Sequence, residues 1–227
     1  MAARAEPRIA AFFDLDGTLL DSNIVVFYVK LMTCEMSKWK RRFWLLRLAV
    51  RIPIFLAVDK ISRAAFNRLF YRLYRGVDVA TIERLAAETF RRFTLPRLFP
   101  EATETIRRHQ TEGHEVVFVT GTASFIAEPL AAHLGVKHVF AVHLEEKGAR
   151  FTGRLLDEPL SGERKASVVV EFARVHGVDL SQSYAYGDST ADIPMLRAVG
   201  NPIVVNPSKR LRLFALRNGW RIVRWKL

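Results

Sequence analysis

The chain has 227 residues, half of them hydrophobic, and a formal net charge of +12. It is long enough to bury a sizeable core and to hold one domain, or one domain with an insertion. Its single cysteine, Cys34, excludes an intrachain disulfide framework and a multi-cysteine metal site, and is typical of a reducing compartment. No apolar run with a cleavage pattern precedes the first apolar segment, so we expect no signal peptide and a cytoplasmic location.

The predicted elements begin with a buried strand that starts near residue 9 and runs into Asp14-Leu15-Asp16-Gly17-Thr18. The pattern is then helical from residue 22 to about residue 95. After a helix that opens at Pro100 and closes at Gly113, strands alternate with helices. The predicted strands cover residues 115–119, 137–142, 184–187 and 202–205; the helices cover residues 123–134, 163–176 and 191–199; a hairpin covers residues 143–155, with Lys147-Gly148 at its turn.

This alternation predicts an α/β fold, a doubly wound parallel sheet with helices on both faces. The long helical piece interrupts the pattern directly after the first strand. We therefore expect a catalytic core made of residues 1–21 and 97–227, and a helical cap of residues 22–96.

Charged and polar residues follow the predicted strands at the points where those strands end. Asp14 and Asp16 follow the first strand, Thr120-Gly121 follows the second, and Asp188, with Asp192 behind it, follows the strand over residues 184–187. Ligands of such sheets bind at the carboxyl ends of the strands. Lys165 lies in the first turn of a predicted helix, where the helix dipole disfavours a cation unless an anion is bound nearby.

These residue types together suit the hydrolysis of a phosphate monoester. Asp14 is the expected nucleophile, through an aspartyl-phosphate, and Asp16 the expected general acid and base. A magnesium ion takes oxygen ligands, for which we expect Asp14, the main-chain carbonyl of Asp16, and Asp188, with Asp192 in support. The Thr120 hydroxyl, the Gly121 amide and Lys165 are expected to hold the phosphate oxygens. Each motif alone also fits an ordinary turn, cap or surface position, and only their conjunction favours catalysis.

The same residues resemble the motifs of the haloacid dehalogenase superfamily of aspartate-nucleophile phosphatases. Asp14-Leu15-Asp16-Gly17-Thr18, Thr120-Gly121, Lys165 and Gly187-Asp188 with Asp192 are similar to its four motifs, in order. The helical insertion is similar to the cap of the phosphoserine-phosphatase-like subfamily, as is the run over residues 151–162. The resemblance implies the residue roles given above and a magnesium cofactor. Phosphoserine phosphatases carry acidic residues after the first motif, whereas this chain reads Asp21-Ser22-Asn23-Ile24.

The cap is strongly basic. Between residues 36 and 75 there are eleven lysines and arginines and one acidic residue, Asp59, and no acidic residue follows Asp192. The stretch over residues 43–58 is apolar but carries Arg47 and Arg51, so it is too short and too charged to span a membrane. A broad apolar face with basic margins suits a helix lying in a membrane interface, although packing on a neighbouring helix or in a dimer explains the pattern equally well.

Two classes of function follow. The favoured one is a magnesium-dependent phosphomonoester phosphatase whose substrate is an amphiphilic or lipid phosphate, of the lysophosphatidate or phosphatidylglycerophosphate type. Its alternative is a small-metabolite phosphatase of the phosphoserine phosphatase type. The second class is a catalytically idle membrane-binding module. The expected partners are a phosphomonoester substrate and, through the cap, an anionic membrane surface. The protein would then lie peripherally on the inner face of the membrane. Nucleic acid is disfavoured as a partner, and the oligomeric state is left open.

Overall fold

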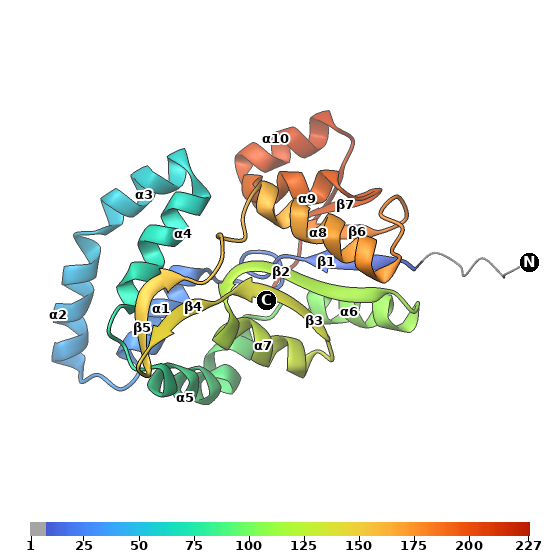
Figure 1. The fold of residues 1–227 in the computed structure, drawn as a ribbon. Coiled ribbons are helices and arrows are strands. Elements are labelled where there is room, and N and C mark those ends of the chain that lie inside the picture. Colours follow the sequence, from blue (N-terminus) through green and yellow to red (C-terminus); the bar gives the residue numbers. More distant parts are fainter. Residues whose placement is uncertain (1–7) are drawn as a thin grey trace, which may run out of the picture.

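The computed structural model describes residues 8–227, which form a parallel sheet with helices on both faces and a helical cap at one end (Figure 1). The sheet has six strands in the order β3-β2-β1-β6-β7-β8, all parallel. Their bounds are Ala10–Phe13 (β1), Glu115–Ala123 (β2), His138–Val142 (β3), Tyr184–Gly187 (β6), Asn201–Val205 (β7) and Arg221–Val223 (β8). The predicted fold class is therefore confirmed.

The central strand β1 is buried on both faces, because each of its four residues is fully covered. Phe12 contacts one apolar cluster, to which α8 (Glu163–His176), α9 (Ile193–Arg197) and α10 (Lys209–Arg217) contribute. Phe13 contacts the other cluster, to which α6 (Pro100–Thr111) and α7 (Ser124–His133) contribute. The run of apolar residues before Asp14 thus fills a three-layer core, and it delivers the polar residues that follow to the edge of the sheet.

The cap contains α1 (Ile24–Thr33), α2 (Lys38–Ala49), α3 (Ile52–Ile61), α4 (Arg63–Tyr71) and α5 (Val79–Thr89). A short 3-10 turn follows α4, and after α5 two further irregular turns over Phe90–Thr94 and Leu95–Arg97 lead into α6. Figure 1 shows α2 and α3 at the outer edge of the cap, on the side away from the sheet. Aromatic residues fill the interior of the cap, where Phe70 packs against the rings of Tyr28, Phe55, Phe66 and Tyr71.

The hairpin of β4 (Leu144–Lys147) and β5 (Arg150–Leu155) follows β3 in the chain but pairs with the cap. The Gly76 amide donates to the Phe151 carbonyl at 2.8 Å, and the Phe151 amide donates to the Val77 carbonyl at 3.0 Å. The Val79 amide donates to the Ala149 carbonyl at 3.0 Å. The hairpin is therefore joined to the segment between α4 and α5 by backbone hydrogen bonds.

Several predicted boundaries are corrected. The strand predicted over residues 115–119 runs on to Ala123, because the chain pairs again with β3 at Val142 after an irregularity in register. The helix predicted over residues 191–199 is a 3-10 turn, Thr190–Asp192, followed by the short helix α9. The apolar stretch over residues 43–58 is divided between α2 and α3, since α2 ends at Ala49 and Pro53 lies in the first turn of α3.

The strand predicted last, over residues 202–205, is not the last. After β7, helix α10 crosses over and β8 adds a sixth parallel strand beside it. β8 is only three residues long and begins with an exposed arginine, so its sequence carries too few alternating positions to be recognised. The final strand therefore extends the sheet by one edge position beyond the prediction.

Candidate active site

The loop after β1 folds tightly and places both carboxylates at the carboxyl end of the sheet. The Gly17 amide donates to the Leu20 carbonyl at 2.8 Å, and the amides of Leu19 and Leu20 donate to the Leu15 carbonyl. Gly17 has a φ of +79°, and a Cβ at this position would collide with Asp188 Oδ2. Glycine is required here both for the backbone conformation and for the close approach of the loop to Asp188.

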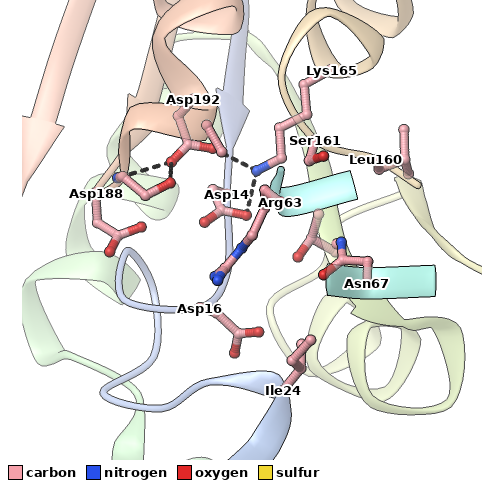
Figure 2. Close-up of a pocket in the computed structure, with 14 residues that line it drawn as sticks. Asp14, Asp16, Ile24, Arg63, Asn67, Leu160, Ser161, Lys165, Asp188 and Asp192 are labelled. Carbon is pink, nitrogen blue, oxygen red and sulfur yellow. Dashed lines mark hydrogen bonds and ion pairs between the residues drawn. The ribbon is translucent and has the colours of Figure 1, made fainter. Parts of the chain in front are cut away.

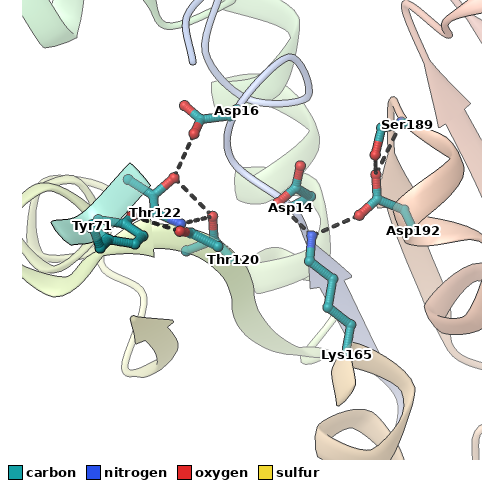
Figure 3. A network of polar contacts seen from close by, with 9 residues as sticks. Asp14, Asp16, Tyr71, Thr120, Thr122, Lys165, Ser189 and Asp192 are labelled. Atoms are coloured by element: carbon teal, nitrogen blue, oxygen red, sulfur yellow. Dashed lines mark hydrogen bonds and ion pairs between the residues drawn. The ribbon is translucent and has the colours of Figure 1, made fainter. Parts of the chain in front are cut away.

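Lys165 joins two of the acids by short ion pairs. Its Nζ donates to Asp14 Oδ1 at 2.6 Å and to Asp192 Oδ1 at 2.7 Å, and its side chain is almost fully buried (Figures 2 and 3). Burial alone lowers the pKa of Lys165, but the charges of Asp14 and Asp192 outweigh burial and raise it. Lys165 is therefore a permanent cation, held at the third position of α8 by its two acidic partners.

The carboxylates lie close together. Donor atoms of Asp14, Asp188 and Asp192 lie within 4.8 Å of one another. Burial raises the pKa of Asp14 to about 7, against the opposing charge of Lys165. Burial, with the charges of Asp192 and Asp14, raises the pKa of Asp188 well above its usual range. Burial also acts to raise the pKa of Asp192, but the charge and hydrogen bond of Lys165 and the hydrogen bonds from Ser189 hold it below the usual value.

This group of acids fits a hard divalent cation. Three acidic side chains share one ammonium, so ionising all three would leave two negative charges without a counter-charge, and the raised pKa values of Asp14 and Asp188 reflect this. Carboxylate oxygens are the donors that such a cation prefers. Both oxygens of Asp192 already accept hydrogen bonds, from Lys165 and from Ser189, so this residue suits the supporting place expected for it. Asp14 and Asp188 are the side chains left to hold the cation.

Asp16 lies on the other side of the pocket and is held by threonines of β2. Thr122 Oγ1 donates to Asp16 Oδ2 at 2.7 Å, and Thr120 Oγ1 donates to Thr122 Oγ1 at 3.1 Å (Figure 3). Asp16 Oδ1 is buried without a hydrogen-bond partner in residues 8–227. Burial raises the pKa of Asp16 to about 6, and the hydrogen bond from Thr122 opposes this rise. Thr122 was not among the residues predicted from the sequence, and only the structure shows its contact with Asp16.

The cap contributes residues that the sequence did not single out. Arg63 and Asn67, one turn apart on α4, line the pocket with Asp14, Asp16 and Lys165 (Figure 2). The remaining lining is made by Ile24, Thr120, Gly121, Leu160, Ser161, Asp188, Ser189, Ala191 and Asp192. Arg63 Nη1 donates to Asp59 Oδ1 at 2.9 Å, whereas Asn67 Oδ1 is buried with no partner in the part of the chain that the structure describes. The Cα of Gly121 leaves room for Asn67, because a Cβ there would lie 3.1 Å from Asn67 Nδ2.

All the predicted site residues therefore line one pocket, with Thr120 and Gly121 in it as expected. Asn23 lies in the segment where phosphoserine phosphatases carry acidic residues. It does not line the pocket but caps α1, where it accepts hydrogen bonds from the amides of Val25 and Val26. The Tyr71 hydroxyl donates to the Gly121 carbonyl at 2.8 Å and so joins the cap to β2 beside the pocket.

The chain matches one family model and several known proteins. A family model of the haloacid dehalogenase-like hydrolases matches residues 11–197. The inhibition of morphological differentiation protein of Streptomyces azureus is 35% identical over 96% of this chain and 78% of its own length. A probable phosphatase of Mycobacterium tuberculosis is 32% identical over 95% of this chain and 75% of its own length. A phosphoserine phosphatase of the same species is 29% identical over 94% of this chain and 70% of its own length.

Among solved structures, a protein of unknown function from Bordetella pertussis superimposes with a TM-score of 0.80 at 28% identity, over 96% of this chain and 98% of that chain. The likeness therefore extends over the cap as well as the sheet.

Proposed function

The chain belongs to the haloacid dehalogenase-like hydrolases and is a phosphatase of that family, and we infer that it hydrolyses a small phosphomonoester with magnesium through a phosphorylated Asp14. The observation that carries this inference is the ion-pair network in which Lys165 joins Asp14 to Asp192 beside Asp188. Buried acids gathered around one lysine are costly for stability, so a reaction is the best reason for their presence.

In the first step, an oxygen of Asp14 attacks the phosphorus and the bond to the ester oxygen breaks. Lys165 contacts Oδ1 of Asp14, and Oδ2 has no hydrogen-bond partner among the described residues, which leaves it available for the attack. Thr120, Gly121 and Lys165 line the same pocket and would hold the phosphate oxygens. Asp14, Asp188 and the main-chain carbonyl of Asp16 would hold magnesium, with Asp192 in support. When bound, magnesium would neutralise negative charge on the phosphate oxygens.

Asp16 would move the protons. It gives a proton to the leaving ester oxygen, and in the second step it takes a proton from the water that attacks the phosphorylated Asp14 and releases phosphate. A group that serves in both directions works best when its pKa is near the working pH, and the pKa of Asp16 is raised to about 6. Thr122 holds this carboxylate in place at 2.7 Å.

The pocket favours a small and polar leaving group. Its lining is mostly charged or polar, with Ile24, Leu160 and Ala191 as the apolar contributors. Arg63 from the cap faces the acidic pair Asp14 and Asp16 and would contact a second anionic group on the substrate, oriented by its pairing with Asp59. Asn67 would accept a hydrogen bond from a substrate donor through its unpartnered oxygen.

The comparisons favour the same choice. Two of the three relatives reported above are named as phosphatases, one of them a phosphoserine phosphatase, and none of the three names is that of an enzyme acting on a lipid. The small-metabolite alternative is therefore better supported than the lipid phosphate that the cap sequence favoured. The catalytically idle alternative has no support, because the acids and Lys165 lie together in the pocket and two of the reported relatives are named as phosphatases.

The test of the reaction is a screen of phosphoserine, sugar phosphates, lysophosphatidate and phosphatidylglycerophosphate with and without Mg²⁺. We expect turnover of small phosphomonoesters that EDTA removes and Mg²⁺ restores. Asp14→Asn should abolish turnover, whereas the exposed Asp157→Asn should not. Acid quenching during turnover, followed by mass spectrometry, should find the phosphoryl group on Asp14. Turnover retained by Asp14→Asn would remove Asp14 as the nucleophile.

The substrate class has its own test. Arg63→Ala should raise KM for phosphoserine by roughly 10- to 100-fold, because a hydrogen bond to a charged group contributes about 1.5–3 kcal/mol. It should leave KM nearly unchanged for a simple alkyl phosphate, whose leaving group carries no charge. Arg68→Ala, on the exposed side of the same helix, is the matched control. An equal effect on both substrates would show that Arg63 does not read a second anionic group.

A further inference from the structure

The outer edge of the cap exposes large apolar side chains to an unusual degree. Of the fourteen large apolar residues that are exposed in residues 8–227, eight lie between Trp39 and Ile61, on α2, on α3 and at Val50 between them. Trp39 is 82% exposed, Val50 77% and Ile61 87%. Exposed apolar residues on a soluble protein are normally scattered, and a continuous group of them marks an interaction surface.

On α2, and at Val50, which caps its C-terminal end, these residues form a single stripe. Trp39, Phe43, Leu46 and Val50 follow one another at alternating intervals of four and three residues, so they lie on one side of the helix. The opposite side carries Leu48, which is buried, and Trp44, which packs against the ring of Tyr28 at 5.6 Å. The stripe is therefore not the face by which α2 packs on the cap. We call the eight exposed apolar residues between Trp39 and Ile61, together with the exposed basic residues of α2 and Arg51, the outer cap surface.

Basic residues border the stripe on both sides. By helical position, Lys40 and Arg47 lie along one margin and Lys38 and Arg42 along the other. Arg51 follows in the turn between α2 and α3, and all five are exposed. No acidic residue occurs from residue 36 to residue 58. The flanking acid Glu35 is paired with Arg84 at 3.0 Å, and Asp59 is paired with Arg63. The charge of the outer cap surface is thus uniformly positive.

This charge decides which partner fits. A second copy of the chain would bring the same positive margins together, which is unfavourable. Nucleic acid would leave the aliphatic side chains of the stripe without a partner. An anionic bilayer offers both an apolar boundary for the stripe and negative headgroups for its margins.

We propose that the outer cap surface binds the headgroup region of an anionic membrane, with α2 and α3 lying in the plane of the interface. No helix in residues 8–227 is long and apolar enough to cross a bilayer. The proposal does not require a lipid substrate. The residues of the outer cap surface are separate from those that line the pocket, and Figure 1 shows α2 and α3 on the far side of the cap from the sheet.

The test is flotation of the full chain with vesicles of phosphatidylcholine alone and of phosphatidylcholine with phosphatidylglycerol. We expect binding to the anionic vesicles only, weakened by salt. The double variant Phe43→Ser with Leu46→Ser, and separately Lys40→Glu with Arg47→Glu, should each reduce the bound fraction by roughly tenfold or more. The emission of Trp39 should shift to the blue on binding, and this shift should be absent in Trp39→Phe.

The matched control is the double variant Leu213→Ser with Leu216→Ser on α10. These two leucines have the same spacing as Phe43 and Leu46, are 59% and 61% exposed, and also lie on a basic helix. It should bind vesicles like the wild type. All variants should keep the circular dichroism spectrum and the turnover of a soluble substrate, because none of these residues lies in the pocket. Each of three outcomes would overturn the proposal. The first is unchanged vesicle binding in both cap variants, and the second is an equal loss of binding in the α10 control. The third is that the wild type binds no vesicles and forms a dimer that dissociates in the Phe43→Ser, Leu46→Ser variant.

Discussion

Thr122→Val removes the hydroxyl that holds Asp16 while keeping the size and branching of the side chain. Thr122 is 1% exposed and its hydroxyl makes the hydrogen bond to Asp16 Oδ2 at 2.7 Å. Because Asp16 Oδ1 has no partner within residues 8–227, the variant would leave neither carboxylate oxygen with a hydrogen bond from the protein. A hydrogen bond to a charged group is worth about 1.5–3 kcal/mol, which corresponds to roughly 10- to 100-fold in rate.

The size of the loss should depend on the leaving group. An alkyl phosphate needs a proton from Asp16 as its ester bond breaks, whereas 4-nitrophenyl phosphate releases a stable anion without one. We expect kcat/KM to fall by the full amount for the alkyl phosphate and by much less for the nitrophenyl ester. The hydrogen bond also lowers the pKa of Asp16, so the limb of the pH profile set by this group should move to higher pH in the variant.

The assay is steady-state hydrolysis of both esters across the pH range, with Thr122→Ser as the control that keeps the hydroxyl. An equal loss on both esters, or a pH profile that does not move, would refute the role of Thr122 in positioning Asp16 as the proton donor.

Three further outcomes are expected. Lys165→Met should abolish turnover and lower the free energy of unfolding by about 3–5 kcal/mol at pH 8, because it leaves buried carboxylates unpaired. The pKa of Asp14 in the folded protein is raised to about 7, so Asp14 is protonated at pH 5 and the loss measured by urea unfolding should be smaller there. Burial lowers the pKa of His109 to about 4, so stability should be lost as pH falls from 6.5 toward 4, by up to about 3 kcal/mol, and thermal unfolding of His109→Gln should depend less on pH in that window. Gly17→Ala should abolish turnover by displacing Asp188, whereas Gly148→Ala, which also has a positive φ but meets no atom within 4 Å, should keep full activity.

The parts of the fold that could be predicted are those in which one local signal is strong. The strand before Asp14 is a continuous apolar run, and α8 is marked by Gly162 before it and Gly177 after it, so the predicted and observed bounds of α8 agree. The site residues of the core follow from the same signals, because strands that end at one edge of a sheet bring their polar residues together.

The parts that could not be predicted depend on packing between distant segments. Arg63 is one of eleven basic residues in its region, and only the position of α4 over the pocket distinguishes it. Thr122 looks like any threonine after a strand until its contact with Asp16 is seen. β8 is stabilised by pairing with β7 rather than by its own three residues.

The pairing of the hairpin with the cap has a consequence for how such a protein changes over evolution or by design. The backbone bonds of Phe151 and Ala149 to the segment over residues 76–79 mean that the cap is completed by a piece of chain encoded far downstream of it. An exchange of residues 22–96 between relatives would keep these backbone bonds but would place the side chains of another protein against the hairpin. A chimaera that is to keep the packing between the cap and the hairpin must therefore transplant two discontinuous gene segments, the second of them the hairpin β4–β5, so the exchangeable unit is larger than the inserted cap itself.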